Sequence, residues 1–363
     1  RLEPMLRRCA GWVAQLEPIP TSARAVFGYY ADSGVFDAGS LRLKRRIDDT
    51  VEGMVAEAFR DVEEALAEEF GHSYVSFEYD TKLLLPAKLT LGYLYRELDE
   101  GEYHEAERIT RLIVEALLDG DMRDALNDDE YEDFVVDFET TTTERARIAE
   151  LAHDVLRARV ESKFERFPDE VREAYDAGVE ISEAHQDEDE RFRSLASRAR
   201  DGDEAALASI EETYKHAGFE AEPELFTGDE LALPYLKTQY DRVGVIYDAM
   251  MDMYRGAGFE IPVRFQRSIV LAIIGAQIWL DDLDDYEDDL ADGQLTPVTA
   301  EYLLAETGTE AKAAVVEISE AYLDRAREQA TAADSALTGI ATEYIDRSGN
   351  PEKLPTAVPD AFA

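Results

Sequence analysis

The chain has little basic charge. Its 363 residues include 37 lysines and arginines, of which eight are lysines, against 81 aspartates and glutamates, for a formal net charge of −44. Such a surface repels phosphate groups, so we expect no nucleic acid among its partners. Hydrophobic residues still make up 45% of the chain, which excludes a disordered acidic tail. A carboxylate-rich, lysine-poor surface suits a salt-filled cytoplasm, where repulsion is screened within roughly 3 Å. We therefore expect a cytoplasmic, halophilic protein.

Cysteine and long apolar runs are also scarce. The single cysteine, Cys9, excludes an intrachain disulfide scaffold. The longest apolar run, Ile269 to Leu280, is shorter than the roughly 20 residues that span a bilayer. We expect no transmembrane segment. No signal-peptide pattern is visible, although a chain that starts at Arg1 leaves a removed leader open.

Helical periodicity dominates the chain. From Ile47 to Phe70 apolar residues recur every three or four positions, and Gly71 is placed to end that helix. The threonines before Glu144 are typical of a helix N-cap. No stretch alternates at period two, so we expect an all-α protein. The expected helices cover residues 47–70, 83–98, 105–118, 144–160, 168–199, 203–216, 230–255, 261–291, 297–306 and 309–345.

The expected domain organisation is a single large helical bundle over residues 1–347. Residues 1–75 are a candidate N-terminal helical extension of it. The acidic, turn-rich segment 218–234 is the best candidate for an internal linker. Residues 348–363 hold three prolines and are expected to form an extended tail.

One segment joins an apolar half to an acidic half. Residues 268–280 are apolar on nearly every side and should be buried, whereas residues 281–292 are crowded with aspartates. At about 100° per residue, one helix face should change from apolar to anionic. The anionic stripe holds Asp281, Asp285, Asp288 and Asp292, flanked by Asp282 and Asp289, and it continues backwards through Gln277, Ile278 and Ile274 as the wall of a cavity. Trp279, Leu283 and Leu290 occupy the opposite face and should anchor the helix.

Clustered carboxylates repel one another unless they are protonated or bridged by cations. Hard oxygen ligands at this density suit Mg²⁺, which keeps waters and shares itself with substrate phosphates. An apolar shaft beneath a metal rim would suit a molecule with a diphosphate head and a hydrocarbon tail. The alternative is a solvated helix end, because acidic runs such as 187–190 arise on the surface of any chain this acidic.

The segment resembles the aspartate-rich helix of class I isoprenoid (terpenoid) synthases, over residues 268–297. Asp281 to Asp285 fits the DDxxD pattern of chain-elongating prenyl synthases, and Asp284 to Asp288 fits the DxxED pattern of head-to-head synthases. Asp281, Asp285 and Asp289 have the spacing of the metal ligands in terpene cyclases. The string therefore leaves chain elongation, head-to-head coupling and cyclisation open.

The resemblance implies an all-α bundle around an apolar cavity and Mg²⁺-assisted ionisation of an allylic prenyl diphosphate. Asp281 and Asp285 would be the catalytic residues, and the metal ligands would be Asp281, Asp282, Asp285, Asp288 and Asp289. The implied partner is a small-molecule prenyl diphosphate, and a homodimer stays open.

The resemblance also implies a second acidic motif upstream and cations for the diphosphate. The candidates for the motif are Asp119 with Asp124, Asp128 with Asp129, and the string from Asp48 to Glu52. Arg242 and Lys237 lie near the place where cyclases carry an arginine that contacts diphosphate. The family's C-terminal Arg-Tyr pair has only a loose substitute here, in Tyr344 and Arg347.

Two other classes of protein compete with this interpretation. Glu69-x-x-His72 and Glu150-x-x-His153 are two Glu-x-x-His pairs, which helical di-iron carboxylate proteins use together with two further glutamates. The remaining hypothesis is a non-catalytic helical scaffold whose acidic residues serve salt adaptation. The remaining histidines, His104, His185 and His216, are scattered, and surface positions are expected for them.

Overall fold

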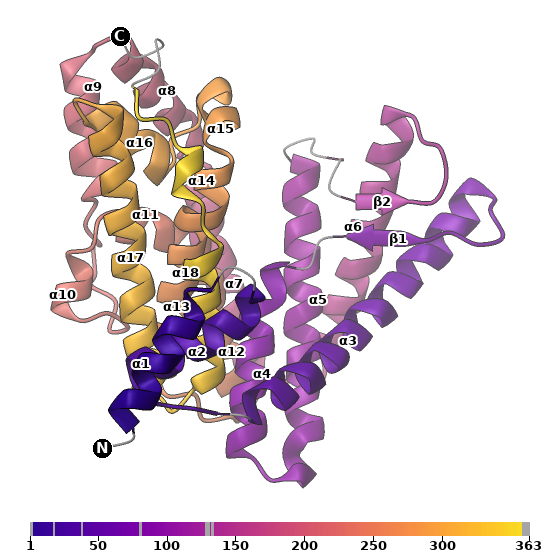
Figure 1. Cartoon of the computed structure of the whole chain (residues 1–363). Helices are drawn as coiled ribbons and strands as arrows, with labels where there is room; N and C mark the ends of the chain where they lie inside the picture. Colours follow the sequence, from indigo (N-terminus) through magenta and orange to yellow (C-terminus); the bar gives the residue numbers. More distant parts are fainter. Residues whose placement is uncertain are drawn as a thin grey trace. The chain divides into compact units, whose positions relative to one another are not determined.

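The computed structural model describes residues 3–16, 19–37, 39–79, 82–127, 131 and 134–357 (Figure 1). The described chain is mostly helical, which confirms the predicted all-α class. It forms two compact units. Unit 1 comprises Arg1–Asp37, Tyr175–Met251 and Ile261–Ala363, and unit 2 comprises Ala38–Ala174 and Asp252–Glu260. Two of the four boundaries fall inside α7 (Asp169–Gln186) and α12 (Val245–Gly256), and the span expected to form one bundle is divided between two units.

Unit 1 is built around α13 (Val263–Ala276), which packs along α17 (Gly308–Ala332). Gly275 permits this close approach, because a Cβ atom there would lie 2.9 Å from Leu323 Cδ2. Within the described residues, one helical segment, Val263–Asp282, is long and apolar enough to cross a membrane. That segment is 61% buried inside the protein, as a core helix is.

The other elements of unit 1 surround this pair. They are α1 (Glu3–Ala14), α2 (Thr21–Ser33), α8 (Asp189–Arg200), α9 (Glu204–Ile210), η3 (Glu211–Lys215), α10 (Gly228–Leu231), α11 (Leu236–Gln239), η4 (Tyr240–Gly244), η5 (Gln277–Asp281), α14 (Asp282–Asp284), α15 (Tyr286–Asp292), α16 (Pro297–Leu304), α18 (Ala336–Ser348) and η6 (Pro351–Lys353).

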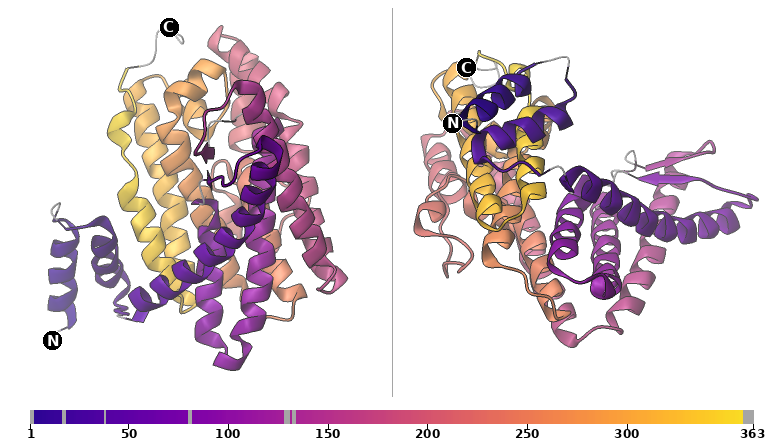
Figure 2. Two further views of the ribbon diagram at one scale, coloured as in Figure 1. Left: turned by 90° about the vertical axis from the view of Figure 1, so that its right-hand side faces the viewer. Right: turned by 60° about the horizontal axis from the view of Figure 1, so that its bottom comes forward.

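The first two helices form a hairpin at the edge of unit 1. Figure 2 shows α2 between α1 and α18, and α2 packs against both of them. The ring of Tyr29 on α2 lies directly over Gly339 of α18, and its hydroxyl group hydrogen-bonds Thr331 Oγ1 at 2.8 Å. Gly339 is therefore the position that lets the hairpin dock.

Unit 2 packs three long helices with one shorter helix and a small sheet. The helices are α3 (Gly39–Phe70), α4 (Leu85–Glu97), α5 (Tyr103–Asn127) and α6 (Thr142–Phe164), with the short turns η1 (Lys82–Leu84) and η2 (Glu100–Glu102) between them. Thr141 caps α6 in a capping box with Glu144, which confirms the predicted N-cap. The carboxylate of Glu115 is fully buried between α5 and α6, where Arg159 Nη2 (2.7 Å) and Lys163 Nζ (2.6 Å) neutralise it.

The sequence did not predict the sheet. Strands β1 (Phe77–Tyr79) and β2 (Phe134–Val136) pair antiparallel, with Phe77 opposite Val136. Each strand has three residues, which are too few to show a period-two pattern. Phe59 of α3 packs edge-on against Phe77 of β1. Tertiary packing rather than local pattern specifies these strands.

The expected linker and tail are both packed onto unit 1. Leu225 and Phe226, from the segment expected to link domains, are buried. In the tail, Leu354 is buried and the Tyr302 hydroxyl group donates a hydrogen bond to the carbonyl oxygen of Pro355 at 2.6 Å. The described part of the tail, up to residue 357, thus belongs to the fold.

We predict that Gly339→Ala destabilises the protein. A methyl group at Gly339 would lie 2.2 Å from Tyr29 Cε2, so the ring must move and give up its hydrogen bond to Thr331. We expect the free energy of unfolding to fall by about 1–3 kcal/mol, measured by thermal or urea denaturation. Gly53→Ala is the matched control: Gly53 lies in α3 with nothing within 4 Å of its Cβ position, so alanine should raise stability by about 1 kcal/mol. Equal stability of the two variants would contradict the docking described here.

Candidate functional site

Three helices of unit 1 each contain a π turn. The turns are η3, η4 and η5, and they contribute Tyr214, Arg242 and Gln277 to one buried polar network. A π turn inserts one extra residue into a helix and is frequent at functional sites. The convergence of three such turns on one network marks this part of unit 1 as the candidate site.

The centre of the network is an ion pair. Arg242 Nη1 donates to Asp282 Oδ1 at 3.0 Å, and the Asp282 side chain is only 2% exposed. Arg242 Nη1 also donates to Gln239 Oε1 at 3.3 Å, and the Gln277 amide group donates to Asp282 Oδ1 at 3.3 Å. Burial raises the pKa of Asp282, with Arg242 opposing, whereas the Asp282 carboxylate raises the pKa of Arg242 against the effect of burial. Arg242 therefore favours the charged form of Asp282, and Asp282 favours the charged form of Arg242.

Tyr214 and Gln239 extend the network. The Gln239 amide group donates to the hydroxyl oxygen of Tyr214 at 3.4 Å, and that hydroxyl group donates to the carbonyl oxygen of Leu295 at 2.8 Å. Burial raises the pKa of Tyr214. The sequence analysis missed both residues, because a single tyrosine or glutamine on a helix carries no spacing signal.

The π turn at η5 changes which aspartates continue the buried face. An unbroken α-helix would continue Ile274 and Ile278 into Asp281, Asp285 and Asp288. The extra residue moves this face on by one position, and the helix also breaks at Asp285. The predicted stripe is therefore wrong in register. The buried or half-buried residues are Asp282, Tyr286 and Asp289, whereas Asp281, Asp285, Asp288 and Asp292 are exposed.

The opposite face is as predicted. Trp279 and Leu283 are buried, and Leu290 is half-buried. The indole Nε1 of Trp279 donates to the carbonyl oxygen of Asp346 at 2.9 Å. This face anchors the acidic end of the helix to α18.

The aspartates that follow Asp282 in the chain concentrate negative charge next to the Arg242–Asp282 ion pair. The pKa of Asp289 is raised to about 7, by burial first and also by the neighbouring carboxylates of Asp282, Asp285 and Asp288, while Arg242 opposes. The pKa of Asp285 is also raised, by burial and by the carboxylates of Asp282, Asp288 and Asp284, while Lys353 opposes. The acid cluster consists of Asp281, Asp282, Asp285, Asp288 and Asp289. Since Asp285 and Asp289 lie among other carboxylates that raise their pKa values, the cluster favours the arrival of a cation or a proton.

The donor set of the acid cluster fits Mg²⁺, which prefers carboxylate oxygens. Among the described residues, however, no group of three or more histidine, cysteine, aspartate or glutamate side chains is gathered closely enough to hold a metal ion. Mg²⁺ often takes only one or two protein carboxylates and completes its shell with water and substrate phosphate. The arrangement therefore suits a metal ion bound together with a phosphate-bearing ligand rather than a resident ion.

The predicted cavity wall lies at a tight helix contact. Ile274 and Ile278 are buried, and Gln277 is half-buried. A Cβ atom on Gly244 of η4 would lie 3.3 Å from Ile274 Cδ1 and 3.3 Å from Val270 Cγ1. A hydrocarbon chain could lie along Ile274 only if α13 and η4 moved apart.

The two predicted diphosphate-binding cations, Lys237 and Arg242, lie on α11 and η4. Lys237 forms an ion pair with Asp241, one turn further along. Arg242 lies at the centre of the network and keeps 29% of its side chain exposed. Near them, His185 of α7 is half-buried, and burial together with Arg242 lowers its pKa. The sequence suggested a surface position for His185.

The predicted second acidic motif belongs to unit 2, while the acid cluster belongs to unit 1. Asp119 is buried on α5, with Asp119 Oδ1 3.4 Å from His153 Nε2 and Asp119 Oδ2 3.8 Å from Arg157 Nη1. Burial raises the pKa of Asp119, and His153 and Arg157 oppose this. Asp124 lies 3.9 Å from Arg123 Nε. Asp128 and Asp129 lie outside the described residues.

The third candidate for the second acidic motif, residues 48–52, forms ion pairs at the surface of unit 2. Asp48, on α3, pairs with Lys44 and Lys88. None of the described candidates for the second motif shares a compact unit with the acid cluster.

The two Glu-x-x-His pairs do not assemble a di-iron site. Gly71, at φ +69°, ends α3 before His72, whose ring packs on Phe138 instead. Glu69 and Glu150 both bind Arg147. Their carboxylates are thus committed to an arginine.

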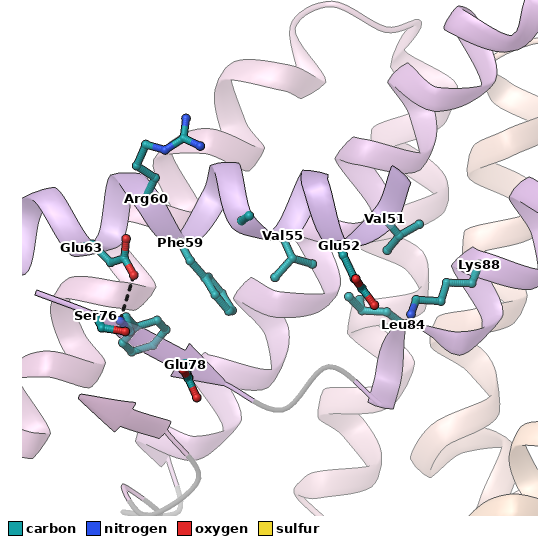
Figure 3. A pocket seen from close by; sticks show the side chains of 12 residues that line it. Val51, Glu52, Val55, Phe59, Arg60, Glu63, Ser76, Glu78, Leu84 and Lys88 are labelled. Carbon is teal, nitrogen blue, oxygen red and sulfur yellow. Dashed lines mark hydrogen bonds between the residues drawn. The ribbon is translucent and has the colours of Figure 1, made fainter. Parts of the chain in front are cut away.

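Two surface cavities lie away from the acid cluster. One, of about 420 Å³, is a groove in unit 2 with an apolar floor that includes Val55 and Phe59 of α3 and a charged rim (Figure 3). The other, of about 550 Å³, lies beside α1 in unit 1. Neither is lined by a residue of the polar network.

Comparisons with known proteins identify no relative: no family model, no curated protein and no solved structure matches this chain. Function must therefore be argued from the site itself.

We predict that Arg242→Met destabilises the protein strongly, because it leaves the carboxylate of Asp282 buried without a counter-charge. Removing one partner of a buried pair costs 3–5 kcal/mol, and we expect about 3 because Arg242 is partly exposed. The double variant Arg242→Met, Asp282→Leu should recover most of this loss in thermal denaturation. Arg191→Met, which removes an exposed pair with Glu188, should change stability by less than about 1 kcal/mol. A single Arg242 variant as stable as the wild type would refute the central role of the pair.

Proposed function

We propose that the acid cluster binds the diphosphate group of an allylic prenyl substrate together with Mg²⁺, and that the protein is an isoprenoid synthase that ionises this substrate. The observation that carries the proposal is the charge imbalance at the end of a buried apolar helix. Asp289 and Asp285 lie among neighbouring carboxylates that raise their pKa values, while Arg242 is paired with Asp282.

The charge imbalance distinguishes this site from the buried Glu115 of unit 2. In unit 2, two cations neutralise the buried carboxylate of Glu115. In the acid cluster, the pKa values of Asp285 and Asp289 are raised partly by their acidic neighbours. Carboxylates that repel one another lower the stability of the folded chain, and a bound cation would reduce that cost.

Each residue of the site has a role in this proposal. Asp285 and Asp289 would hold the metal ion, with Asp281 and Asp288 beside them. Asp282 would fix Arg242, whose Nη1 is used for Asp282 and Gln239, so that the other guanidinium nitrogens can donate to the diphosphate. Bound Mg²⁺ would supply charge neutralisation for the departing diphosphate. The apolar side chains beneath would exclude water from the cation left behind.

The product class stays open in this proposal. Chain elongation, head-to-head coupling and cyclisation all begin with the same ionisation, and the acid cluster serves each of them equally.

A second candidate is a non-catalytic helical scaffold. The contact of Gly244 with Ile274 favours it, because that contact fills the place where a substrate chain would lie. In a scaffold the Arg242–Asp282 pair would only specify how the helices pack, and prenyl diphosphates would not be consumed.

We predict that the protein releases diphosphate from allylic prenyl diphosphates only when Mg²⁺ is present. The assay incubates radiolabelled substrates of several chain lengths at high KCl, as the acidic composition suggests, and measures diphosphate and labelled products. Asp285→Asn combined with Asp289→Asn should lower the rate at least a hundredfold, because both proposed metal ligands lose their charge. Asp284→Asn is the matched control, since Asp284 lies in the same acidic string but pairs with Lys353. No turnover by a folded wild-type protein with any substrate would support the scaffold instead.

We further predict that Mg²⁺ and inorganic diphosphate together raise the melting temperature more than either does alone, because the metal ion needs phosphate oxygens to complete its shell. Differential scanning calorimetry at constant ionic strength measures this. The rise should be lost in the Asp285→Asn, Asp289→Asn variant and kept in Asp284→Asn. An equal rise in all three proteins would show that the ions bind elsewhere.

A further inference from the structure

The N-terminal hairpin exposes an unusual amount of apolar surface. In an otherwise acidic chain, Met5 is 64% exposed, Leu6 55% and Trp12 65%, all on α1. Val35 and Phe36, just after α2, are 40% and 57% exposed. Exposed apolar side chains that gather in one place mark an interaction surface, whereas single ones need no explanation.

The exposed apolar side chains of α1 form one stripe along the helix. At about 100° per residue, Trp12, Met5 and Cys9 lie within an arc of about 60°, and Val13 and Leu6 continue it on one side. The opposite side of α1 packs on α2 through Ala10 and Ala14, which are buried, and Gly11 sits against Ala31. The helix is thus docked by its small residues and presents its large ones outward.

The charges on α1 are unlike those of the rest of the chain. α1 has one acidic residue, Glu3, and two arginines, whereas the whole chain has 81 acidic and 37 basic residues. Arg7 is tied to α2 through the carbonyl oxygens of Ala31 (2.9 Å) and Asp32 (2.5 Å). Arg8 is exposed and lies at the edge of the stripe next to Trp12. Trp, Met and Leu flanked by arginine is the composition of helices that lie in the interface of a lipid bilayer.

A second copy of the chain fits this surface less well. The middle of α1 lies between Arg8 and Cys9, so two copies related by a twofold axis through that point would bring the two Arg8 side chains together. Like charges at an apolar contact oppose association. A lipid surface instead offers phosphate groups to Arg8 and acyl chains to the stripe.

We propose that α1 is a membrane-surface anchor, which lays the stripe formed by Met5, Leu6, Cys9, Trp12 and Val13 into the interface of a lipid bilayer. The anchor is independent of the reaction proposed for the acid cluster. It would hold the protein at a bilayer without any segment that spans it.

The stripe contains its own probes. Cys9 is the single cysteine of the chain and is exposed, so an environment-sensitive fluorophore can be attached to it without further substitutions. Of the two tryptophans, Trp12 is exposed and Trp279 is 5% exposed, so a lipid-borne quencher should act on Trp12. The experiment titrates the full chain with vesicles of phosphatidylcholine, and with vesicles of phosphatidylcholine and phosphatidylglycerol, at high and low KCl. We expect a blue-shifted, several-fold brighter probe and quenched Trp12 fluorescence.

Matched variants test the assignment. Met5→Ser combined with Trp12→Ser should weaken binding to both vesicle types at least tenfold, because two large apolar side chains are lost. Arg8→Gln should weaken binding to the phosphatidylglycerol vesicles more than to the others. A probe on Tyr344→Cys in a Cys9→Ser chain, at an exposed apolar position on α18, should report no change of environment. Asp285→Asn, Asp289→Asn should bind vesicles as the wild type does.

Two results would overturn the anchor. One is a Cys9 probe that stays in water at saturating lipid. The other is a probe that is already shielded without lipid, in a manner that depends on protein concentration, since this would assign the stripe to a contact between copies.

Discussion

The buried carboxylate of Asp282 is the constraint around which the candidate site is organised. A carboxylate that is 2% exposed needs a counter-charge, and Arg242 supplies it at 3.0 Å. The extra residue of a π turn lies on the segment that carries each partner, and a third π turn places Tyr214 beside them. Without these turns the regular helix spacing would direct other side chains to the centre of the unit. The irregular helices thus bring Arg242, Asp282 and Tyr214 together in one network.

The same pair sets the electrostatics above it. Burial and the neighbouring carboxylates raise the pKa values of Asp285 and Asp289, while Lys353 opposes at Asp285 and Arg242 at Asp289. Glu115 in unit 2 differs in this respect, because two cations neutralise its carboxylate. A neutralised carboxylate needs no ligand, whereas carboxylates that repel one another gain stability from a cation. This difference is why the function is assigned to the acid cluster rather than to the buried charges of α5 and α6.

The sequence predicted most helices, the capping box at Thr141 and the anchoring face with Trp279, because these follow from local spacing and capping chemistry. It could not predict the register of the acid cluster, since a π turn leaves the apolar pattern helical while shifting its phase by one residue. The strands at Phe77 and Phe134 were missed because long-range packing specifies them. The division into two units was also missed, because two of its four boundaries fall inside the continuous helices α7 and α12 and none falls in the turn-rich segment 218–234.

The central claim is that Asp285 and Asp289 of the acid cluster bind a divalent cation together with diphosphate. Crystals grown with Mn²⁺ and inorganic diphosphate test this directly through the anomalous scattering of manganese. The account predicts an anomalous peak within coordination distance of Asp285 or Asp289, next to a diphosphate contacted by Arg242, with Asp282 still paired to Arg242. A peak bound by Asp281 and Asp288 without Asp289, or diphosphate bound with no metal at the acid cluster, would contradict it.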